Sequence, residues 1–445
     1  MAKIVILGAG LTGLSTAYHL EKKGFFDYKI FEKESEIGGL CRSVFQDGFT
    51  FDYTGHLLHI NNDYFKSFIK NTVGLGHFTI ASRRSAIYSH DAYTEYPFQT
   101  NLFGLPENVV VECIEEFVKK PITTTKSYYE WVLHNFGAGF GKHFFFPYQQ
   151  KIFSYNPKHL TSSWTGRFVP ATTLKQIIRG ALQKQSKKIG YNATFYYPKK
   201  GGTISWIKKI KEQILNTVNT NMCVNRLDCK NKRVHFTNGN SEPFETLVNT
   251  IPLDLFLQSL QESSQTNLQS ASNKLLCASV INFNLGISRK NLSNKSWIYF
   301  PEKRFPFYRI GFPHTFSNNM TPKNNSSLYG EISYLHEQKK SVVNQAICST
   351  KKLFGIQNNE IATQNIISIP HAYVIYNEWR DKNIGSIHQR LMEQNIYSIG
   401  RYGGWNYSSM QEAVLDGKQV VENILEKQTK QIKQKKKREN EAVLL

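Results

Sequence analysis

Paired cysteines and long apolar runs are missing from this 445-residue sequence. The six cysteines form no Cys-x-x-Cys pair and no Cys/His spacing that suits zinc. No apolar run approaches the roughly 20 residues that cross a bilayer, and the amino terminus starts directly with a strand-like segment, without the pattern of a signal peptide. We therefore expect reduced cysteines, no metal site, no transmembrane segment and a cytoplasmic protein.

Acidic residues are scarce: 34 face 55 lysines and arginines, which gives a formal net charge of +21. Residues 427–438, KQTKQIKQKKKR, hold seven basic residues and no acid. We interpret 426–445 as a basic tail, either a frayed helix extension or disordered. Such a run can bind nucleic acid or an anionic membrane surface, but a solvated tail is the favoured interpretation. The remaining positive charge is spread out and favours an anionic substrate.

A glycine-rich turn opens the chain. Residues 3–13, KIVILGAGLTG, form a short apolar run that stops at Gly8 and continues through Gly10 and Gly13 into a helix-compatible stretch. Gly8 permits a tight turn, Gly10 leaves no Cβ between the backbone and a pyrophosphate, and Gly13 lets the helix pack close to the strand. The pattern predicts a buried strand that turns into a helix, whose positive end binds a diphosphate.

An acid and a glycine doublet follow at informative distances. The strand-like residues 28–31 end at Glu32, 24 residues after Gly8, near the spacing of an acid that bonds a ribose hydroxyl. The alternative is an ordinary glycine-rich loop with a surface glutamate. Gly38 and Gly39 come just after the acid and supply a second close approach of the backbone to phosphate.

The doublet, in SEIGGLCRS, resembles the extended fingerprint of the FAD-binding amine oxidase and UDP-galactopyranose mutase superfamily, which favours FAD over NAD. Residues 396–424 resemble the carboxy-terminal flavin motif of that superfamily, with a strand ending at Gly400 and a helix beginning near Ser409. The pair Gly55-His56 resembles a mutase pattern at the flavin, although His56 has the alternative of a core histidine. The resemblance implies a cofactor site made by Gly8, Gly10, Leu11, Thr12, Gly13, Glu32, Lys33, Gly39, Leu40, Gly55, His56, Gly400, Arg401, Ser409 and Met410.

Two internal segments resemble UDP-galactopyranose mutases more specifically. Residues 144–170 carry an aromatic-rich signature that ends near Arg167, and residues 297–312, WIYFPEKRFPFYRIGF, resemble a eukaryotic-type mutase stretch with Arg309 on the matching arginine. The resemblance implies that Arg167 and Arg309 hold the diphosphate of a nucleotide sugar, a task that suits bidentate guanidinium groups. It also implies catalytic roles for His56, Tyr373 and Tyr407, beside the flavin and along the substrate channel.

The fold class that we expect is α/β, with a Rossmann-like FAD-binding domain and an inserted α+β substrate domain. Residues 1–95, 196–255 and 390–425 make the discontinuous FAD-binding domain. Residues 96–195 make a mainly helical insert, because 107–119, 127–136 and 174–187 have helical apolar spacing. Residues 256–389 make an antiparallel-sheet substrate region.

Three functions remain open at this point. The first is a mutase-like flavoenzyme, in which the N5 atom of reduced flavin attacks the anomeric carbon of a nucleotide sugar to interconvert pyranose and furanose. The second is an FAD oxidoreductase of amine oxidase or protoporphyrinogen oxidase type, which takes hydride from a small substrate. The third is a non-catalytic or nucleic-acid-binding protein with a flavin fold, with nucleic acid bound only through the basic tail. The first also needs an external reductant or NAD(P)H.

Overall fold

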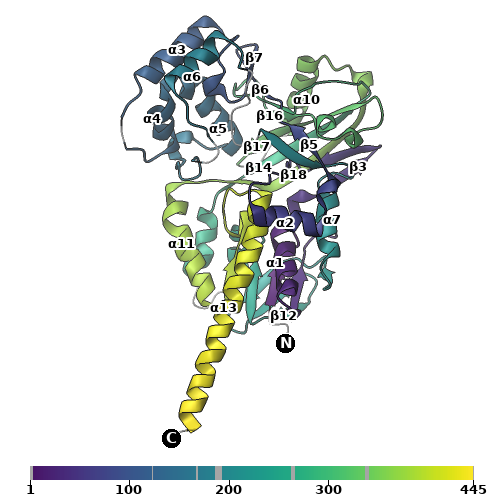
Figure 1. The fold of residues 1–445 in the computed structure, drawn as a ribbon, viewed down its shortest axis with the longest axis vertical. Helices are drawn as coiled ribbons and strands as arrows, with labels where there is room; N and C mark the ends of the chain where they lie inside the picture. Colours follow the sequence, from purple (N-terminus) through teal and green to yellow (C-terminus); the bar gives the residue numbers. More distant parts are fainter. Residues whose placement is uncertain are drawn as a thin grey trace.

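The computed structural model describes residues 4–122, 124–166, 169–185, 193–261, 266–335 and 340–443. Figure 1 shows two stacked parts. The part that holds the amino terminus contains a parallel sheet with its helices, and the other part contains a larger sheet and a group of helices. The α/β class expected from the sequence is confirmed.

The parallel sheet has five strands, and the strand of the glycine-rich turn is central. Its order is β19 (Ile396–Ser398), β13 (Thr246–Asn249), β1 (Ile4–Leu7), β2 (Tyr28–Phe31) and β9 (Val218–Asn219). All four residues of β1 are buried, as is usual for a central parallel strand covered on both faces. The pairing of β13 with β1 confirms that the chain returns to its first sheet near residue 247.

Helices α1 (Leu11–Lys22) and α13 (Met410–Val443) pack closely on each other beside this sheet. The Ser15 hydroxyl donates to the Val414 carbonyl at 2.7 Å. A Cβ at Gly417 would lie 2.7 Å from the Ser15 Oγ atom, so glycine is needed at this crossing. The first helix of the chain, α1, and its last helix, α13, are therefore packed together beside the parallel sheet.

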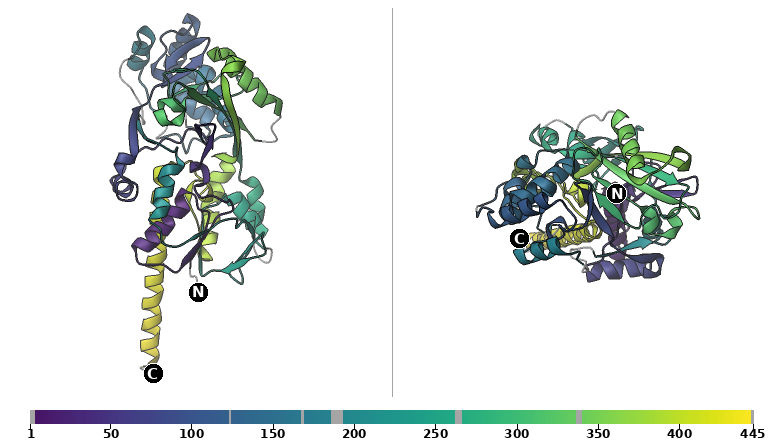
Figure 2. Two further views of the ribbon diagram at one scale, coloured as in Figure 1. Left: turned by 90° about the vertical axis from the view of Figure 1, so that its right-hand side faces the viewer. Right: turned by 90° about the horizontal axis from the view of Figure 1, so that it is seen from above.

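The structure corrects the expectation of a disordered tail. Helix α13 continues without interruption to Val443, and Figures 1 and 2 show its last turns extending away from the rest of the molecule. The other alternative, a helix extension, agrees with this. Lysine, glutamine, arginine and glutamate dominate residues 426–441 and have favourable helix propensities, which explains a helix without tertiary packing.

The second sheet has seven strands and lies in the other part of the molecule. Its order is β18 (Ile361–Val374), β14 (Cys277–Ile287), β17 (Ser326–Tyr334), β16 (Arg309–Gly311), β15 (Trp297–Tyr299), β6 (Ser85–Ser89) and β7 (Ala92–Glu95). Neighbours are antiparallel except β6 and β15. We expected residues 1–95 in the flavin domain, whereas β6 and β7 pair with this sheet. Their pairing joins distant parts of the chain, which a local pattern does not encode.

The described residues of the helical insert include four α-helices and a π-helical turn. They are α3 (Glu107–Val118), α4 (Tyr128–Phe140), the π-helical turn Gly141–Phe145, α5 (Phe146–Phe153) and α6 (Leu174–Leu182). Ser127 begins α4 with a reciprocal capping box to Glu130, and Thr173 begins α6 in the same way with Gln176. The helices agree with the helical spacing of this region.

The remaining elements are short. The strands are β3 (Ser43–Gln46), β4 (Phe49–Asp52), β5 (Phe78–Ser82), β8 (Thr194–Pro198), β10 (Val224–Asp228), β11 (Arg233–Phe236) and β12 (Ser241–Pro243). The helices are α2 (Asp63–Thr72), α7 (Ile204–Glu212), α8 (Leu253–Gln258), α9 (Thr266–Ala271), α10 (Lys340–Phe354), α11 (Glu378–Glu393) and α12 (Gly400–Gly403). Across the described ranges, no helix has the length and apolar character to span a membrane.

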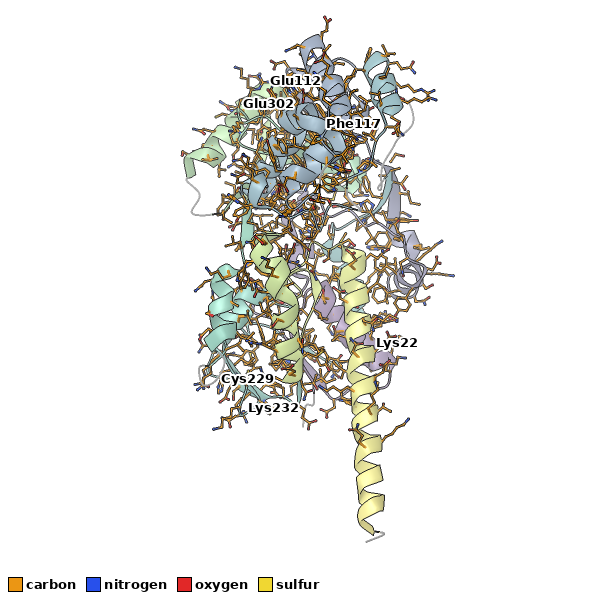
Figure 3. The ribbon with its side chains drawn as sticks, turned by 90° about the vertical axis from the view of Figure 1, so that its left-hand side faces the viewer. Lys22, Glu112, Phe117, Cys229, Lys232 and Glu302 are labelled. Atoms are coloured by element: carbon orange, nitrogen blue, oxygen red, sulfur yellow. The ribbon has the colours of Figure 1, made fainter. Side chains whose placement is uncertain are left out.

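A histidine pair ties the helical insert to the second sheet. His143 Nε2 lies 2.9 Å from Glu112 Oε2 on α3, and His143 Nδ1 lies 3.1 Å from Nε2 of His90 in the β6–β7 turn. The His90 backbone N–H donates to Glu302 Oε2 at 3.1 Å. Figure 3 labels Glu112 and Glu302 close together at this junction. The contacts attach the insert to the loop between β15 and β16, which precedes Arg309.

Candidate active site

The glycine-rich turn has the shape that a bound diphosphate needs. Gly8 has φ +96°, and a Cβ on Gly13 would lie 1.9 Å from the Gly8 carbonyl oxygen, so both positions require glycine. Gly10 is different, because the nearest atom to its ideal Cβ is the Gly39 Cα at 3.8 Å. A Cβ on Gly10 would therefore meet the glycine doublet only at van der Waals distance.

The acid after β2 lies directly beside this turn. Glu32 is buried, and its Oε2 atom accepts from the Ala9 N–H at 2.8 Å while Oε1 accepts from the Glu34 N–H at 3.0 Å. Each carboxylate oxygen has a further lone pair for a ribose hydroxyl. Lys33, expected at the cofactor, is 61% exposed at its side chain and pairs with Glu34 at 3.5 Å, so its side chain does not point into the turn.

The glycine doublet packs against the first turn. The Gly38 N–H donates to the Ala9 carbonyl at 2.9 Å, and Gly38 and Gly39 have φ values of +112° and +55°. Leu40 is partly buried against the core. Two further predicted residues, Leu11 and Thr12, are buried in the first turn of α1.

A buried carboxylate fixes the strand that leads to Gly55 and His56. Asp52, at the end of β4, accepts from the Thr203 N–H at 3.0 Å, the Thr203 hydroxyl at 2.7 Å and the Tyr197 hydroxyl at 2.5 Å. Burial nonetheless raises the pKa of Asp52 above its ordinary value. The sequence analysis missed this residue, although an acid that ends an apolar strand was a visible signal.

His56 lies close to two guanidinium groups. Its Nδ1 atom is buried and makes no hydrogen bond to a described residue. Burial, and after it the charges of Arg401 and Arg309, lower the pKa of His56 to about 4. A Cβ on the preceding Gly55 would lie 2.2 Å from the Tyr329 hydroxyl oxygen. The imidazole is therefore neutral at pH 7 and has an unused polar atom.

The carboxy-terminal motif approaches from the other end of the chain. Gly400 has φ +80°, and its ideal Cβ would lie 2.6 Å from the Thr12 Oγ1 atom. Arg401 donates to the Ser408 carbonyl at 2.7 Å and to the Ala372 carbonyl at 3.0 Å. Within the described part of the chain Arg401 pairs with no carboxylate, so its buried charge favours an electron-rich group nearby.

Ser409 caps α13 and does not offer a free amide. The Ser409 N–H donates to Glu412 Oε2 at 2.6 Å, and the Glu412 N–H donates to the Ser409 hydroxyl oxygen at 3.3 Å. We expected the Ser409 and Met410 amides to face the flavin. The capping box, which the sequence S-M-Q-E encodes, uses the first of them. Met410 begins the helix and is partly buried.

Arg309 is held by a carboxylate that the sequence analysis missed. Its Nε and Nη2 atoms donate to Glu331 Oε2 and Oε1 at 2.6 and 2.7 Å, a bidentate pair between the neighbouring strands β16 and β17. The Glu331 side chain is 0% exposed and that of Arg309 is 19% exposed. Burial opposes the charge of Arg309, but Glu331 and nearby tyrosines offset it and raise the pKa of Arg309 well above its ordinary value.

Tyrosines join these charged groups. The rings of Tyr373 and Tyr407 stack with centroids 6.2 Å apart, and Arg401 lies 4.8 Å from the Tyr407 ring centroid. The Tyr308 hydroxyl donates to the Tyr373 hydroxyl at 3.2 Å. Burial raises the pKa of Tyr373, so its phenol stays protonated at neutral pH. We call His56, Arg309, Glu331, Tyr373, Arg401 and Tyr407 the site cluster.

One predicted residue cannot be placed in this cluster. Arg167 lies outside the described residues, so its role stays a prediction. Trp164, three residues earlier, is buried, and its ring centroid lies 5.9 Å from that of Tyr407. The aromatic signature of the helical insert therefore reaches the site cluster. Glu331 was the main omission, and a lone glutamate inside the apolar strand LYGEISY was its signal.

The polar groups and the glycine turns of this region fit FAD. Three of these groups follow strands of the parallel sheet: Gly10 follows β1, Glu32 follows β2 and Arg401 follows β19. His56, whose Nδ1 atom is buried without a hydrogen bond, follows β4. The ends of the three parallel strands form the edge at which such sheets bind dinucleotides.

Comparisons with known proteins agree with the geometry. The sequence model of the family "Flavin containing amine oxidoreductase" matches residues 11–425. A crystal structure of reduced UDP-galactopyranose mutase superposes with a TM-score of 0.89 at 25% identity, covering 95% of this chain and 93% of that one. A putative protoporphyrinogen oxidase from Exiguobacterium sp. 255-15 superposes with a TM-score of 0.74 at 17% identity, covering 95% and 98%.

Curated relatives match over shorter stretches. An uncharacterized protein in the nifH2 3' region of Methanothermococcus thermolithotrophicus is 46% identical over 61 residues, which are 14% of this chain and 58% of that protein. The chain thus spans less than two thirds of the length of the curated relatives that it matches first. The match to the family model, in contrast, covers nearly all of the chain. The chain therefore belongs to the family of flavin-containing amine oxidoreductases and is an FAD-dependent enzyme.

Proposed function

We propose that this flavoenzyme interconverts the pyranose and furanose forms of a nucleotide sugar. The observation that carries the proposal is the convergence of three distant segments on His56. The charges of both Arg309 and Arg401 act on its imidazole. We therefore infer that His56, Arg401 of the crossover before α13 and Arg309 of the second sheet share one site.

The charge and shape of the site cluster suit a nucleotide diphosphate. Glu331 neutralises the charge of Arg309 but occupies only two of its three guanidinium nitrogens, Nε and Nη2. The pair fixes the plane of the guanidinium and leaves Nη1 for a phosphate oxygen. Arg401 adds a second positive charge, so the cluster as a whole remains cationic.

The tyrosines of the site cluster would position the sugar. Tyr373 is a protonated hydrogen-bond donor, and both Tyr373 and Tyr407 have flat apolar faces that are partly exposed. Tyr308 holds the Tyr373 hydroxyl in place. Neutral His56 can donate or accept one hydrogen bond at the flavin side of the site. These residues bind and orient; none is placed to act as a nucleophile.

FAD would be held by the glycine-rich turn, Glu32, the Gly38-Gly39 doublet, Gly55, His56, Gly400 and Arg401. In its reduced form, the bound cofactor supplies the nucleophilic nitrogen that the isomerisation needs. The likeness to reduced UDP-galactopyranose mutase, at a TM-score of 0.89 over 95% of this chain, supports this reaction over others of the family.

A second function has support from the family itself. The matching family model is that of amine oxidoreductases, and a putative protoporphyrinogen oxidase shares the fold. In that case, a small reduced substrate would transfer hydride to oxidised FAD, and Arg309 would serve only to stabilise Glu331. The two functions differ in whether Arg309 contacts a ligand.

Binding of UDP to the reduced protein tests the proposal. We expect UDP to bind the dithionite-reduced flavoprotein and Arg309→Lys to weaken binding about tenfold or more, because lysine loses the planar fork. Arg226→Lys is the matched control, since Arg226 is exposed on β10 and its guanidinium contacts His235. Equal UDP affinity in all three proteins, or none in the wild type, would contradict the proposal.

A further inference from the structure

Helix α13 continues beyond the body of the protein. Ile424 is the last of its described side chains to be buried, whereas the helix runs on to Val443. We call residues 427–443 the α13 stalk. At 1.5 Å per residue the stalk is about 26 Å long, and Figure 2 shows it projecting from the end of the molecule that holds the parallel sheet. Most of its length is therefore accessible to a partner.

Basic positions are distributed around the whole stalk. It carries seven basic residues and only two acids, Glu439 and Glu441. The basic residues are Lys427, Lys430, Lys433, Lys435, Lys436, Lys437 and Arg438. At 3.6 residues per turn, these positions fall on all sides of the helix axis and not in one row. The stalk therefore suits a partner that places negative charge on more than one side of a helix.

The stalk lacks an apolar face. Ile432 is the only large apolar residue of the sequence between 426 and 441. Helices that lie in the surface of a membrane bury an apolar face among the lipid headgroups. A membrane surface would also meet only one side of the stalk and would leave many of the basic positions away from it. The composition therefore favours nucleic acid over an anionic membrane.

A hollow at the base of the stalk continues the positive charge onto the body. Its volume is about 500 Å³, and it is lined by Lys23, just after α1, and by side chains of α13 that include Lys430 and Lys433. These three lysines are exposed, and no carboxylate of the described residues pairs with them. Of the two acids that line the hollow, Glu426 and Glu422, the second is already paired with a lysine one turn earlier, at 2.6 Å. Phosphate groups can therefore bind here.

We propose that the α13 stalk binds double-stranded DNA in its major groove. A helix with its side chains is about 10–12 Å across, and the major groove of B-form DNA is about 12 Å wide, with phosphates along both walls. Lys22 and Lys232, labelled in Figure 3, are exposed at the same end of the body and add to the positive charge there. Contacts to phosphates carry no sequence information, so we expect binding without sequence preference. The inference does not depend on the reaction that the enzyme catalyses.

Fluorescence anisotropy of a labelled DNA duplex tests the inference. The full-length, flavin-loaded protein is titrated into a duplex of about 24 base pairs and mixed sequence. We expect a Kd of about 1–100 μM at about 150 mM salt, the usual range of sequence-independent binding. The logarithm of the affinity should fall against the logarithm of the salt concentration with a slope of about −4 to −5, because about five phosphates lose their counterions.

A fourfold variant tests whether the stalk makes these contacts. Its substitutions are Lys435→Gln, Lys436→Gln, Lys437→Gln and Arg438→Gln, and glutamine has a helix propensity similar to that of lysine. It should bind the duplex at least about tenfold more weakly, with a salt slope shallower by about 3–4. The matched control removes the same number of charges from exposed lysines of the part that holds the second sheet: Lys290→Gln, Lys303→Gln, Lys323→Gln and Lys352→Gln. It should bind the duplex like the wild type.

Other polyanions complete the test. At equal concentrations of negative charge, single-stranded RNA of the same length and vesicles with about 30% phosphatidylglycerol should both bind at least about tenfold more weakly than the duplex. Equal binding of the RNA, or tighter binding of the vesicles, would overturn the proposal. So would a fourfold variant that binds the duplex as tightly as the wild type, or a control variant that loses as much affinity. Flavin content and circular dichroism identify any variant that does not fold.

Discussion

The Arg309–Glu331 pair shows how one residue sets the properties of a site. A fully buried carboxylate is unfavourable unless a positive group compensates it, and a bidentate guanidinium does so with two short hydrogen bonds. The pair spans neighbouring strands of the second sheet, so the orientation of Arg309 is fixed before any ligand arrives. Rigid placement of this kind lowers the cost of binding a diphosphate.

Removing one partner of this pair should be more harmful than removing both. We expect Glu331→Leu to lower the free energy of unfolding by about 3–5 kcal/mol, because Arg309 is left charged without its partner. The double variant Arg309→Met with Glu331→Leu should recover most of that loss but no longer bind UDP. Urea unfolding of the flavin-loaded proteins measures both. A loss below about 1 kcal/mol in the single variant would show that the pair is not buried as described.

His56 should make stability fall in mild acid. Its pKa is about 4 in the folded protein against an ordinary value of 6.5, so the unfolded chain takes up a proton that the folded one does not. The contribution of neutral His56 to the free energy of unfolding is complete above pH 6.5 and is lost as the pH falls toward 4. We expect His56→Gln to reduce the drop in unfolding free energy between pH 7 and pH 4.5 by about 1–3 kcal/mol.

The matched control for this prediction is the His159→Gln variant, because His159 is exposed on the helical insert. Urea titrations at the two pH values give the comparison. An identical drop in the wild type and the His56→Gln variant would contradict the burial of this imidazole.

Residues could be predicted from the sequence where a local pattern or a family motif surrounds them. Gly8, Gly10, Gly13 and Glu32 lie where the spacing places them. Glu331 was missed because its partner is 22 residues away on another strand, and its role appears only when β16 and β17 pair. Lys33 follows the acid in sequence, but alternation along the chain turns its side chain to solvent.

At the scale of elements, the β1–α1 turn separates two uses of glycine. Gly13 is required by packing, because its ideal Cβ would overlap the Gly8 carbonyl oxygen at 1.9 Å. Gly10 has an ordinary φ of −73°, and its ideal Cβ would contact Gly39 only at 3.8 Å, so the backbone itself tolerates a methyl group there. Its absence of a side chain is explained by the cofactor alone.

Alanine at these two positions should therefore give different results. We expect the Gly10→Ala apoprotein to fold with an unchanged melting temperature. After gel filtration its FAD content should be lower than that of the wild type by about tenfold or more, because the new Cβ occupies the approach of the diphosphate. Gly13→Ala should fail to fold or lose several kcal/mol of stability. Gly385→Ala, at an open position in α11, is the control and should retain FAD. Full FAD retention by Gly10→Ala would contradict the site.

Elements were predictable when their pairing is local. Strand β1 and the helices of the insert follow from the glycine-rich turn and from helical periodicity. The pairing of β6 and β7 with the second sheet could not be predicted, because β6 pairs with β15 about two hundred residues later in the chain. Only the folded chain brings these strands together. The continuation of α13 beyond residue 426 was left open, since propensity alone does not distinguish a marginal helix from a disordered tail.

At the scale of the whole molecule, function depends on three distant parts of the chain meeting. His56 comes from the first segment, Arg309 from the second sheet and Arg401 from the crossover before α13. The β3–β4 pair positions the first and the parallel sheet positions the third, while the histidine-linked insert and the loop before β16 position the second. The distal end of α13 takes no part in this arrangement (Figure 2).

Truncation should separate α13 into a structural half and a dispensable half. We expect a protein that ends at Thr429 to keep its full flavin content and to melt within about 2 °C of the full chain, because the deleted turns extend away from the body. Lys427, which donates to Asn395 at 2.6 Å, is retained. Ending the chain instead at Gly417 should abolish folding, because Val420, Val421 and Ile424 are buried. Loss of flavin from the protein that ends at Thr429 would contradict this division.

The most direct test of the account is turnover of UDP-galactopyranose by the reduced enzyme without oxygen or any other electron acceptor. We predict that UDP-galactofuranose forms over many cycles per flavin, that the flavin remains reduced throughout, and that the oxidised enzyme gives no product. Failure of the reduced enzyme to isomerise the sugar, together with reduction of its oxidised flavin by an amine or a porphyrinogen, would contradict the proposed function and favour the oxidoreductase.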